Sequence, residues 1–393
     1  MKIAVFTDSY INQQSAVSAN ITILKNGLQK LGHEVLIVSC ELEADDCFTQ
    51  EQTVFCPARI SDSLYGQSPK KMKLWSVTRL TDQFAPEIVH IVTFGNMGMH
   101  GLRYAKKHGL PVLTTLYNLH DAIDGYGANS LIKRFNLRKS RKKLFKLLSH
   151  SDVVTSASRK NSVIVRNLKL KCRVRNVPFC VDLDLFKPLY SIDSGVDALR
   201  QKLHIAKEKS IMVFSGRLTD DNCVDRLFEN WGKCISINDN LQLLIVGTGR
   251  EAAFWAEKAK LLGISNQITF AGELPHEELC TCFAMCKAFV SACGAAAVKS
   301  SPVEAIACGI PVLLKKGSAN ADLIAEGVNG FTYSEPAEFG RLVKKLATMD
   351  GDGEVLMKKL VSKTAANLTD INQAKAFVSC YELAVEKYGK REK

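Results

Sequence analysis

The sequence lacks an apolar run that approaches the roughly 18–20 residues of a membrane-spanning helix. Near its start, Ile3–Phe6 is the whole apolar stretch before Asp8, which is too short for the hydrophobic region of a secretion signal. Glycine (25) and proline (10) are too scarce among 393 residues for a collagen-like or low-complexity chain. These absences argue against helical membrane-spanning and fibrous proteins, and we expect a cytoplasmic chain.

The thirteen cysteines lack the even number and the regular spacing of a disulfide framework. Cys280 and Cys282 form C-x-C, whereas zinc sites use C-x2-C pairs with a second pair of ligands. We therefore predict free thiols, many of them buried, and no metal site. The cysteines in apolar runs include Cys40, Cys286 and Cys308.

Hydrophobic residues make up 46% of the chain and charged residues 23%, which is typical of a globular protein. At roughly 100–200 residues per domain, the length predicts two domains. The formal net charge is +12. Such a charge favours an anionic partner: a nucleic acid, a membrane surface or a phosphorylated substrate.

Short apolar runs alternate with helical patterns along the whole chain, and each run is typical of a buried strand. Strands that are apolar on both faces and separated by helices predict a parallel sheet covered on both sides. The predicted strands are Lys2–Phe6, Glu34–Ser39, Glu87–Thr93, Pro111–Tyr117 and Asp152–Ser156, and then Ser210–Gly216, Leu241–Gly247, Gln267–Gly272, Ala288–Ala292 and Pro311–Lys315.

We therefore predict an α/β protein of two Rossmann-like, doubly wound domains that face each other across a cleft. The first spans residues 1–187 and the second residues 188–374. The last helical stretch, about Gly353–Tyr388, is long enough for residues 375–393 to pack back on the first domain. Ligands of such sheets bind at the carboxyl ends of the strands, so residues that follow strands are the candidates for a site.

Three motifs of the second domain follow predicted strands or begin helices. Arg217 leaves a strand end, where a guanidinium can bind an anion bidentately, although a surface arginine fits equally well. Gly247 and Gly249 open the next helix and would let a phosphate approach its positive end, but a lone G-x-G is a weak signal. Glu304 follows Pro302 in the first turn of a helix, which by itself indicates only a well-started helix.

Taken in order, these motifs resemble those of the retaining GT-B glycosyltransferases of family 4. The family pattern runs G-R-L, V-G-x-G and E-A-x-A-x-G-x-P-V, which here are Gly216–Leu218, Val246–Gly249 and Glu304–Val312. The turn Glu326–Phe331 is similar to the glycine-rich turn of the family. The resemblance extends over nearly the whole chain through segments of the first half: Lys2–Asp8, Leu31–Val35, Pro86–His90 and Val177–Asp182.

This resemblance implies a metal-independent hexosyltransferase that uses a nucleotide-diphosphate sugar, needs no cofactor and retains the configuration of the sugar. Arg217 would offset the charge of the diphosphate as the bond to the sugar breaks. Glu304 would accept hydrogen bonds from the ribose hydroxyls. The remaining donor contacts would come from the backbone at Gly216, Gly247, Gly249, Ser300 and Ser301.

The first domain contributes His120, which follows a predicted strand. In the family a histidine at this place lies beside the transferred sugar, so the resemblance implies a catalytic role. A lone histidine is more often structural.

Four features depart from the family pattern. The first acid of the usual E-x7-E is Ala296, and the lysine that usually follows the G-R-L arginine is Asn222. The first loop, Gln13–Val17, has no glycine, and Cys180 replaces another glycine. Lys299 either replaces the missing cation or is a solvated lysine. These losses leave an alternative open, namely a catalytically impaired binding or scaffold protein with the same fold.

Residues 133–146 contain eight basic side chains and no acid. Lys139, Lys142, Lys143 and Lys146 fall on one helical stripe, which we predict to bind an anionic membrane surface. The leucines at 137, 144 and 148 lie on another face and are predicted to point to the core.

A second basic cluster, Lys70–Trp75, pairs cations with an aromatic residue of the kind found at membrane interfaces. A solvated helix face is the alternative for the basic stripe. Nucleic-acid binding is disfavoured because no recognition motif accompanies the charge. Several family 4 members transfer sugars to lipids from the cytosolic face, so we expect a membrane lipid or glycolipid acceptor and a peripheral location.

Overall fold

The computed structural model describes residues 1–8, 16–60, 67–117, 119, 131–189, 194–219, 222–249, 252–294, 298–349 and 351–392. The chain forms two compact units. Unit 1 comprises Met1–Cys180, Ala296–Val298 and Asp370–Lys393, and unit 2 comprises Val181–Ala295 and Lys299–Thr369.

The first unit boundary lies earlier than the 187/188 boundary expected from the sequence. The segment from Val181 belongs to unit 2 because the Val181 N–H donates to the carbonyl of Leu368 at 3.3 Å. The ring of Phe186 also packs edge-on against His276, with the centroids 6.0 Å apart. The second boundary, at 369/370 instead of 374/375, coincides with the start of the last helix.

Unit 1 is built on a nine-stranded sheet whose strands run in the order β3-β4-β2-β1-β6-β7-β8-β9, with β5 paired to β4. All pairs are parallel except β3 with β4 and β4 with β5. The five strands predicted in this half are confirmed, whereas β3, β4, β5 and β9 were not predicted. The bounds are β1 Lys2–Phe6, β2 Glu34–Glu41, β3 Phe48–Gln50, β4 Thr53–Ile60, β5 Gln67–Pro69, β6 Ile88–Ile91, β7 Val112–Leu116, β8 Val153–Ser156 and β9 Arg173–Asn176.

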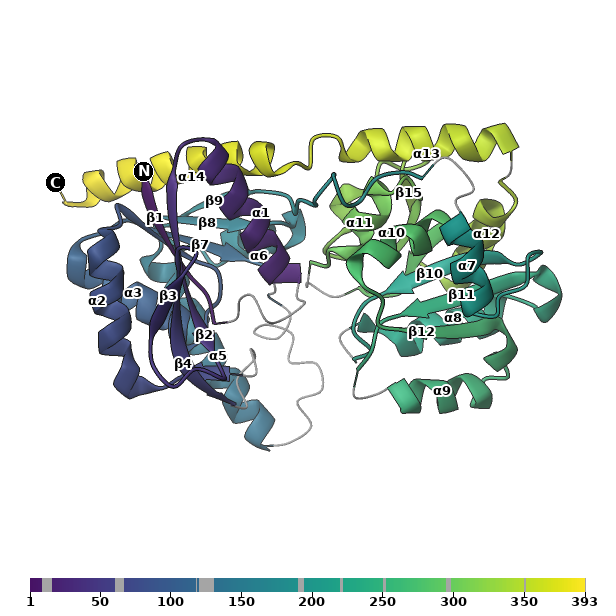
Figure 1. Ribbon diagram of the computed structural model, residues 1–393, viewed down its shortest axis with the longest axis horizontal. Helices are drawn as coiled ribbons and strands as arrows, with labels where there is room; N and C mark the ends of the chain where they lie inside the picture. The colour runs from purple at the N-terminus through teal and green to yellow at the C-terminus, as the bar shows by residue number, and fades with distance from the viewer. Residues whose placement is uncertain are drawn as a thin grey trace. The chain divides into compact units, whose positions relative to one another are not determined.

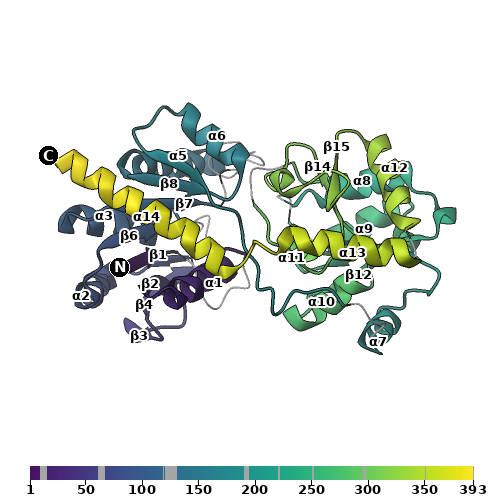
Figure 2. The same ribbon diagram turned by 90° about the horizontal axis from the view of Figure 1, so that it is seen from above.

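Helices cover both faces of this sheet (Figures 1 and 2). Helices α1 (Ala16–Lys30) and α14 (Asp370–Glu392) pack against each other on one face. The other face carries a core cluster to which four helices contribute buried side chains such as Val77, Met97, Leu147 and Val165. These four are α2 (Leu74–Phe84, preceded by the short helix η1, Lys71–Lys73), α3 (Asn96–His108), α5 (Leu131–His150) and α6 (Arg159–Asn167).

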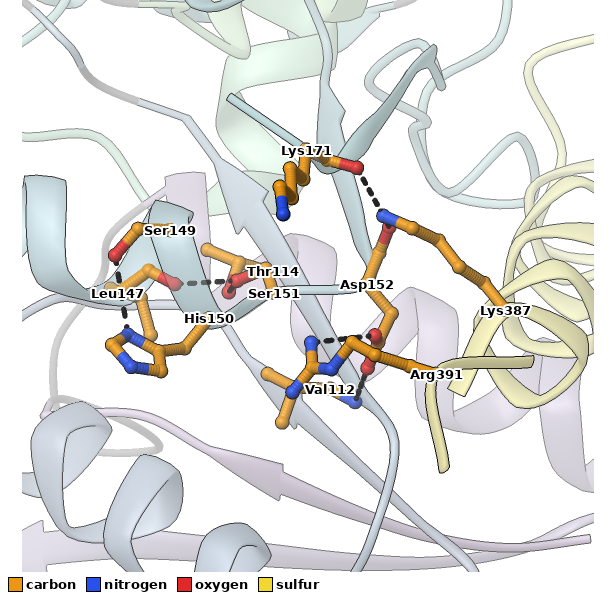
Figure 3. Close-up of polar contacts among 10 residues, drawn as sticks. All are labelled: Val112, Thr114, Leu147, Ser149, His150, Ser151, Asp152, Lys171, Lys387 and Arg391. Carbon is orange, nitrogen blue, oxygen red and sulfur yellow. Dashed lines mark hydrogen bonds and ion pairs between the residues drawn. The ribbon is translucent and has the colours of Figure 1, made fainter. Parts of the chain in front are cut away.

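Polar contacts at intervals along α14 hold this helix to the rest of unit 1. Asp370 forms an ion pair with Lys30 at 2.7 Å, and the Tyr381 hydroxyl lies 2.9 Å from Nδ1 of His90. At the far end, Arg391 forms an ion pair with the buried carboxylate of Asp152 (Figure 3), in which the two atoms are 3.3 Å apart. The C-terminal helix is therefore an integral layer of unit 1.

The single helix expected over Gly353–Tyr388 is wrong, because the chain breaks between Ala365 and Asp370 into two helices. The Leu368 N–H donates to the carbonyl of Ala365 and closes a turn. The carboxylate of Asp370 then accepts the N–H of Ile371 at 2.7 Å and helps to start α14. The first of these helices, α13 (Gly351–Ala365), belongs to unit 2.

Unit 2 contains a six-stranded, wholly parallel sheet in the order β12-β11-β10-β13-β14-β15. The five predicted strands are confirmed, and the expected glycine-rich turn leads into the additional strand β15. The bounds are β10 Ser210–Ser215, β11 Leu241–Val246, β12 Ile268–Gly272, β13 Ala288–Ser291, β14 Val312–Lys315 and β15 Gly330–Tyr333.

Two groups of helices cover the sheet of unit 2. Helices α8 (Val224–Cys234), α9 (Ala252–Leu261) and α12 (Pro336–Ala347) bury Phe228, Trp255 and Leu342 in one core cluster. Helix α13 packs against α11 (Ser301–Ala307), and α7 (Ser194–Lys202) packs against α10 (His276–Ala284). Among the described residues of the unit are the short 3-10 helices η3 Ile237–Asp239, η4 Ser265–Gln267 and η5 Ala321–Leu323.

Two expectations from composition can be compared directly with the structure. All thirteen cysteines are free thiols, and Cys40, Cys286 and Cys308 are buried, as predicted. Within the described ranges, no helix combines the length and the apolar character that a bilayer span requires.

Candidate functional site

The strand order of unit 2 reverses at β10. From β10 the chain builds β11 and β12 on one side, and then returns to add β13 on the other side. In doubly wound sheets this switch point, at the carboxyl ends of the two diverging strands, is where ligands bind. Arg217 lies two residues after the end of β10, and α11 is the helix that follows β13. The fold thus brings the arginine motif and the Glu304 helix to the same edge, on either side of the switch point.

The two glycine motifs form adjoining turns. The Gly216 N–H donates to the carbonyl of Val246, and the Leu218 N–H donates to that of Thr248, both at 2.9 Å. A Cβ at Gly247 would lie 2.1 Å from the Gly216 oxygen, and a Cβ at Gly249 would lie 2.3 Å from that of Leu218. Neither position has room for a side chain. The packing of the two turns therefore requires glycine at Gly247 and Gly249, whether or not a ligand binds there.

The side chain of Arg217 is exposed, whereas its backbone carbonyl accepts a hydrogen bond from a buried side chain of the same unit. The buried amide of Asn222 donates to this carbonyl at 2.5 Å. Its nitrogen also lies 3.5 Å from the position a Cβ would take at Gly216. In this chain, the residue that replaces the family lysine stabilises the turn of the arginine motif.

Glu304 lies in α11 and is only 7% exposed. Its pKa is raised by burial, an effect that a hydrogen bond with the Ser300 side chain and the charge of His276 partly oppose. The Glu304 N–H donates to the Ser300 carbonyl at 3.0 Å, which fixes the backbone of Glu304 in the first turn of the helix. Such a group can accept hydrogen bonds from hydroxyls or, when protonated, donate one.

The segment that leads into α11 is fastened by Asn320, a residue that the sequence reasoning missed. Its side chain accepts the N–H of Lys299 at 2.9 Å and donates to the Lys299 carbonyl at 2.8 Å. Asn320 is buried, and twenty-one positions separate it from Lys299. Such a long-range contact leaves no local sequence signal. Ser300 and Ser301 follow at the start of α11.

At the far end of α11, Gly309 has φ +83°, and a Cβ there would lie 2.9 Å from the carbonyl of Lys358 in α13. The glycine of the E-A-x-A-x-G-x-P-V motif therefore ends the helix and lets α13 pack closely. Its role is structural, and it supports the position of Glu304 indirectly.

Unit 1 has its own switch point between β1 and β6, and a buried carboxylate lies there. Asp8 accepts hydrogen bonds from the Thr93 hydroxyl at 2.6 Å and from the N–H groups of Met97 and Gly98 at 2.9 and 3.3 Å. Burial raises the pKa of Asp8, whereas these hydrogen bonds and the charge of Lys143 lower it. Asp8 thus stabilises the start of α3. Its place directly after an apolar strand was the only sequence signal.

Lys143 differs from the other lysines of the predicted membrane stripe. Its ammonium donates to the side chain of Asn96 at 2.8 Å, and burial lowers its pKa. It therefore points towards the start of α3, where the nearby carboxylate of Asp8 favours its charge. Lys139, Lys142 and Lys146 are exposed.

The sequence also leads to predictions for the leucines of α5 and singles out His120 and Ala296. Leu144 and Leu148 are buried, as predicted from the helical spacing, and Leu137 is half-buried. His120 and Ala296 lie outside the described residues.

Two protein-family models match this chain. The one described as "Glycosyltransferase Family 4" matches residues 19–185, and the one described as "Glycosyl transferases group 1" matches residues 195–361. Together they account for most of both units.

Curated relatives align along most of the chain. An alpha-monoglucosyldiacylglycerol synthase of Streptococcus pneumoniae is 23% identical over 369 residues, which cover 93% of this chain and 83% of the relative. A GDP-mannose-dependent alpha-mannosyltransferase of Mycolicibacterium smegmatis is 23% identical over 358 residues, which cover 87% and 89%.

Solved structures share the fold of the whole chain. HepE of Anabaena, solved in complex with UDP and glucose, superimposes with a TM-score of 0.73 at 16% identity, covering 97% of this chain and 99% of HepE. WaaG, described as a glycosyltransferase involved in lipopolysaccharide biosynthesis, gives a TM-score of 0.70 at 14% identity and covers 96% and 99%.

Proposed function

We propose that this chain, which belongs to the glycosyltransferases with the GT-B fold, moves a hexose from a nucleotide-diphosphate sugar to a membrane lipid or glycolipid. We propose further that the configuration of the sugar is retained and that no metal or other cofactor takes part. The observation that carries the proposal is that Arg217 and the Glu304 helix flank the switch point of unit 2.

On the donor side, the exposed guanidinium of Arg217 binds the diphosphate and stabilises the charge that develops on it as the sugar leaves. The glycine turns let the nucleotide approach the backbone. Glu304 accepts hydrogen bonds from the ribose hydroxyls. Amides at Ser300 and Ser301 bind the phosphates, and Lys299 supplies a further cation next to them.

On the acceptor side, unit 1 provides the lipid-facing elements, and the resemblance to family 4 implies a catalytic role for His120. Two of the relatives are named as glucosyldiacylglycerol synthases, which supports a lipid acceptor. The exposed lysines 139, 142 and 146 of α5 would attract an anionic leaflet, which supports a peripheral location on the cytosolic face of a membrane.

The test is a transfer assay with UDP-, GDP- and ADP-linked hexoses, with and without vesicles that contain diacylglycerol. Nucleoside diphosphate release and the glycolipid product are measured, and NMR of the product gives its anomeric configuration. We expect Arg217→Ala to lower kcat by about 100-fold or more, since it removes a stabilising donor. Lys233→Ala, an exposed lysine at the end of α8, is the matched control and should leave kcat unchanged. Undiminished transfer in the presence of EDTA would support metal independence.

A second candidate follows from Asn222, whose amide is bound to the turn of the arginine motif where the family has a phosphate-binding lysine. In that case the chain binds a nucleotide sugar as a catalytically impaired scaffold. Calorimetric binding of a nucleoside diphosphate without turnover of any sugar would favour this candidate. Failure to bind any nucleotide at millimolar concentration would contradict both.

A further inference from the structure

Two large apolar side chains project from unit 1 at the start of α2. Met72 in η1 is 93% exposed and Trp75 in α2 is 70% exposed. Contact of two neighbouring apolar side chains with water is unfavourable, and clustered exposed apolar residues commonly mark an interaction surface.

The element that carries them is firmly attached, so the exposure is not the fraying of a loop. The Lys70 N–H donates to the carbonyl of Pro57 at 2.8 Å, and Lys73 forms an ion pair with Asp46 at 2.9 Å. On the inner side of α2, Val77 is fully buried in the core cluster. The helix therefore directs Trp75 outwards on a rigid base.

Cations surround this apolar pair. The guanidinium of Arg79 lies 5.4 Å from the centre of the Trp75 ring, and Lys70 and Lys71 are exposed beside Met72. Two acids, Asp45 and Asp46, act electrostatically on Lys73, and Asp46 is already paired with it. The neighbourhood is therefore apolar at its centre and basic around it.

The same face of the sheet carries more positive charge. Helices α2, α3 and α5 all contribute to the core cluster on this face. The cations of α3 and α5 are close enough to affect one another, because Lys139 and Arg103 both lower the pKa of Lys143. The exposed cations of these two helices include Arg103, Lys106, Lys107, Lys139, Lys142 and Lys146.

We propose that Met72 and Trp75 form an apolar anchor that inserts into the interfacial region of an anionic lipid bilayer, while the cations of α2, α3 and α5 contact its headgroups. Tryptophan and methionine favour this interface, and basic residues around them complement anionic lipids. The inference rests on the proposed function only in that a lipid acceptor gives the enzyme a reason to bind a bilayer.

The chain offers an intrinsic probe for this anchor. It has three tryptophans, and the other two, Trp231 and Trp255, are buried in unit 2. Vesicles of phosphatidylglycerol and phosphatidylcholine should shift the emission of Trp75 to the blue, and brominated lipids should quench it. Trp75→Phe should lose both signals while the protein still binds vesicles.

Affinity is measured by co-sedimentation with the same vesicles at low and high salt. The double variant Met72→Ser, Trp75→Ser should bind about tenfold more weakly at either salt concentration, since burial of each large apolar side chain is lost. Leu261→Ser removes a side chain of unit 2 that is 87% exposed, and this control should bind as the wild type does. Circular dichroism should show the same fold in all three variants.

Three results would overturn the anchor: no change in Trp75 emission with vesicles, wild-type affinity in the double variant, or a dimer in solution that the double variant abolishes. The last result would show that this face binds a second copy. Vesicle binding is read without a sugar donor, so the two proposals fail separately. Sugar transfer without insertion of Trp75 overturns the anchor alone, and insertion without any transfer overturns the proposed function alone.

Discussion

The side-chain amide of Asn222 donates a hydrogen bond to the carbonyl of Arg217 at 2.5 Å. The same carbonyl accepts the N–H of Thr219 at 3.0 Å, so the turn that presents the arginine is closed by two donors. A position that carries a ligand-facing cation in the family thus has a structural role in this chain.

Replacing Asn222 by alanine should lower the free energy of unfolding by about 1–2 kcal/mol, because a buried hydrogen bond is lost. Urea denaturation followed by circular dichroism measures this change. Asn238→Ala, at an exposed position in the same unit, should stay within about 0.5 kcal/mol of the wild type. Equal effects of the two substitutions would contradict the role assigned to Asn222.

Gly247 and Gly263 both have positive φ, but they differ in the space around them. A Cβ at Gly247 would meet the Gly216 oxygen at 2.1 Å, whereas nothing lies within 4 Å of one at Gly263. We expect Gly263→Ala to cost about 1–2 kcal/mol through backbone strain alone. Gly247→Ala should cost roughly 2 kcal/mol more because the adjoining turns must separate. Thermal unfolding of the two variants makes the comparison, and similar midpoints would count against the close packing of these turns.

His90 should make stability depend on pH. Burial lowers its pKa to about 3 from an ordinary value of 6.5, and both ring nitrogens lie within hydrogen-bond distance of hydroxyls, those of Tyr381 and Thr115. Between these values the unfolded chain binds a proton that the folded chain does not. The contribution of His90 is therefore fully present above pH 6.5 and is lost as the pH falls towards 3.

His90→Gln keeps a polar side chain at this site but does not titrate. Urea denaturation at a series of pH values should show the wild type losing stability more steeply than the variant as the pH falls below about 6.5. Above that pH the two profiles should run parallel. Parallel profiles over the whole range would show that His90 does not titrate as described.

Asp152 contributes more to the stability of unit 1 than its ion pair with α14 suggests. Its buried carboxylate accepts the N–H of Val112 at 3.0 Å and faces Arg391, whose side chain is 54% exposed (Figure 3). Asp152→Ala should cost about 2–3 kcal/mol because it leaves the Val112 N–H without its acceptor. Arg391→Ala should cost less than about 1 kcal/mol, since solvent screens a half-exposed pair.

Urea denaturation followed by circular dichroism measures both effects. The Asp152 variant should lose clearly more stability than the Arg391 variant. A larger effect from Arg391→Ala than from Asp152→Ala would show that the ion pair dominates.

Most strands that the sequence predicted lie in the middle of a sheet, with the edge strand β12 as the exception, and the strands it missed lie mostly at the edges. Leu241–Val246 is buried at every position, so its apolar run was recognisable. In contrast, β9 buries only Val174 between charged residues, and all three residues of β3 are exposed. Pairing with a neighbouring strand makes these segments β-structure: β3 forms an antiparallel hairpin with β4, and β9 pairs with β8 beyond the intervening helix α6.

The sequence by itself determined the fold class, the two-fold repetition of the α/β pattern and the positions of the glycine, arginine and glutamate motifs, because buried parallel strands and tight turns impose local residue choices. Only the tertiary structure decided which of these residues meet. The Asn320 contact that fastens Lys299 and the hydrogen bond from Lys143 to Asn96 both join residues far apart in the chain. Such contacts depend on strand order and helix packing, which no local pattern records.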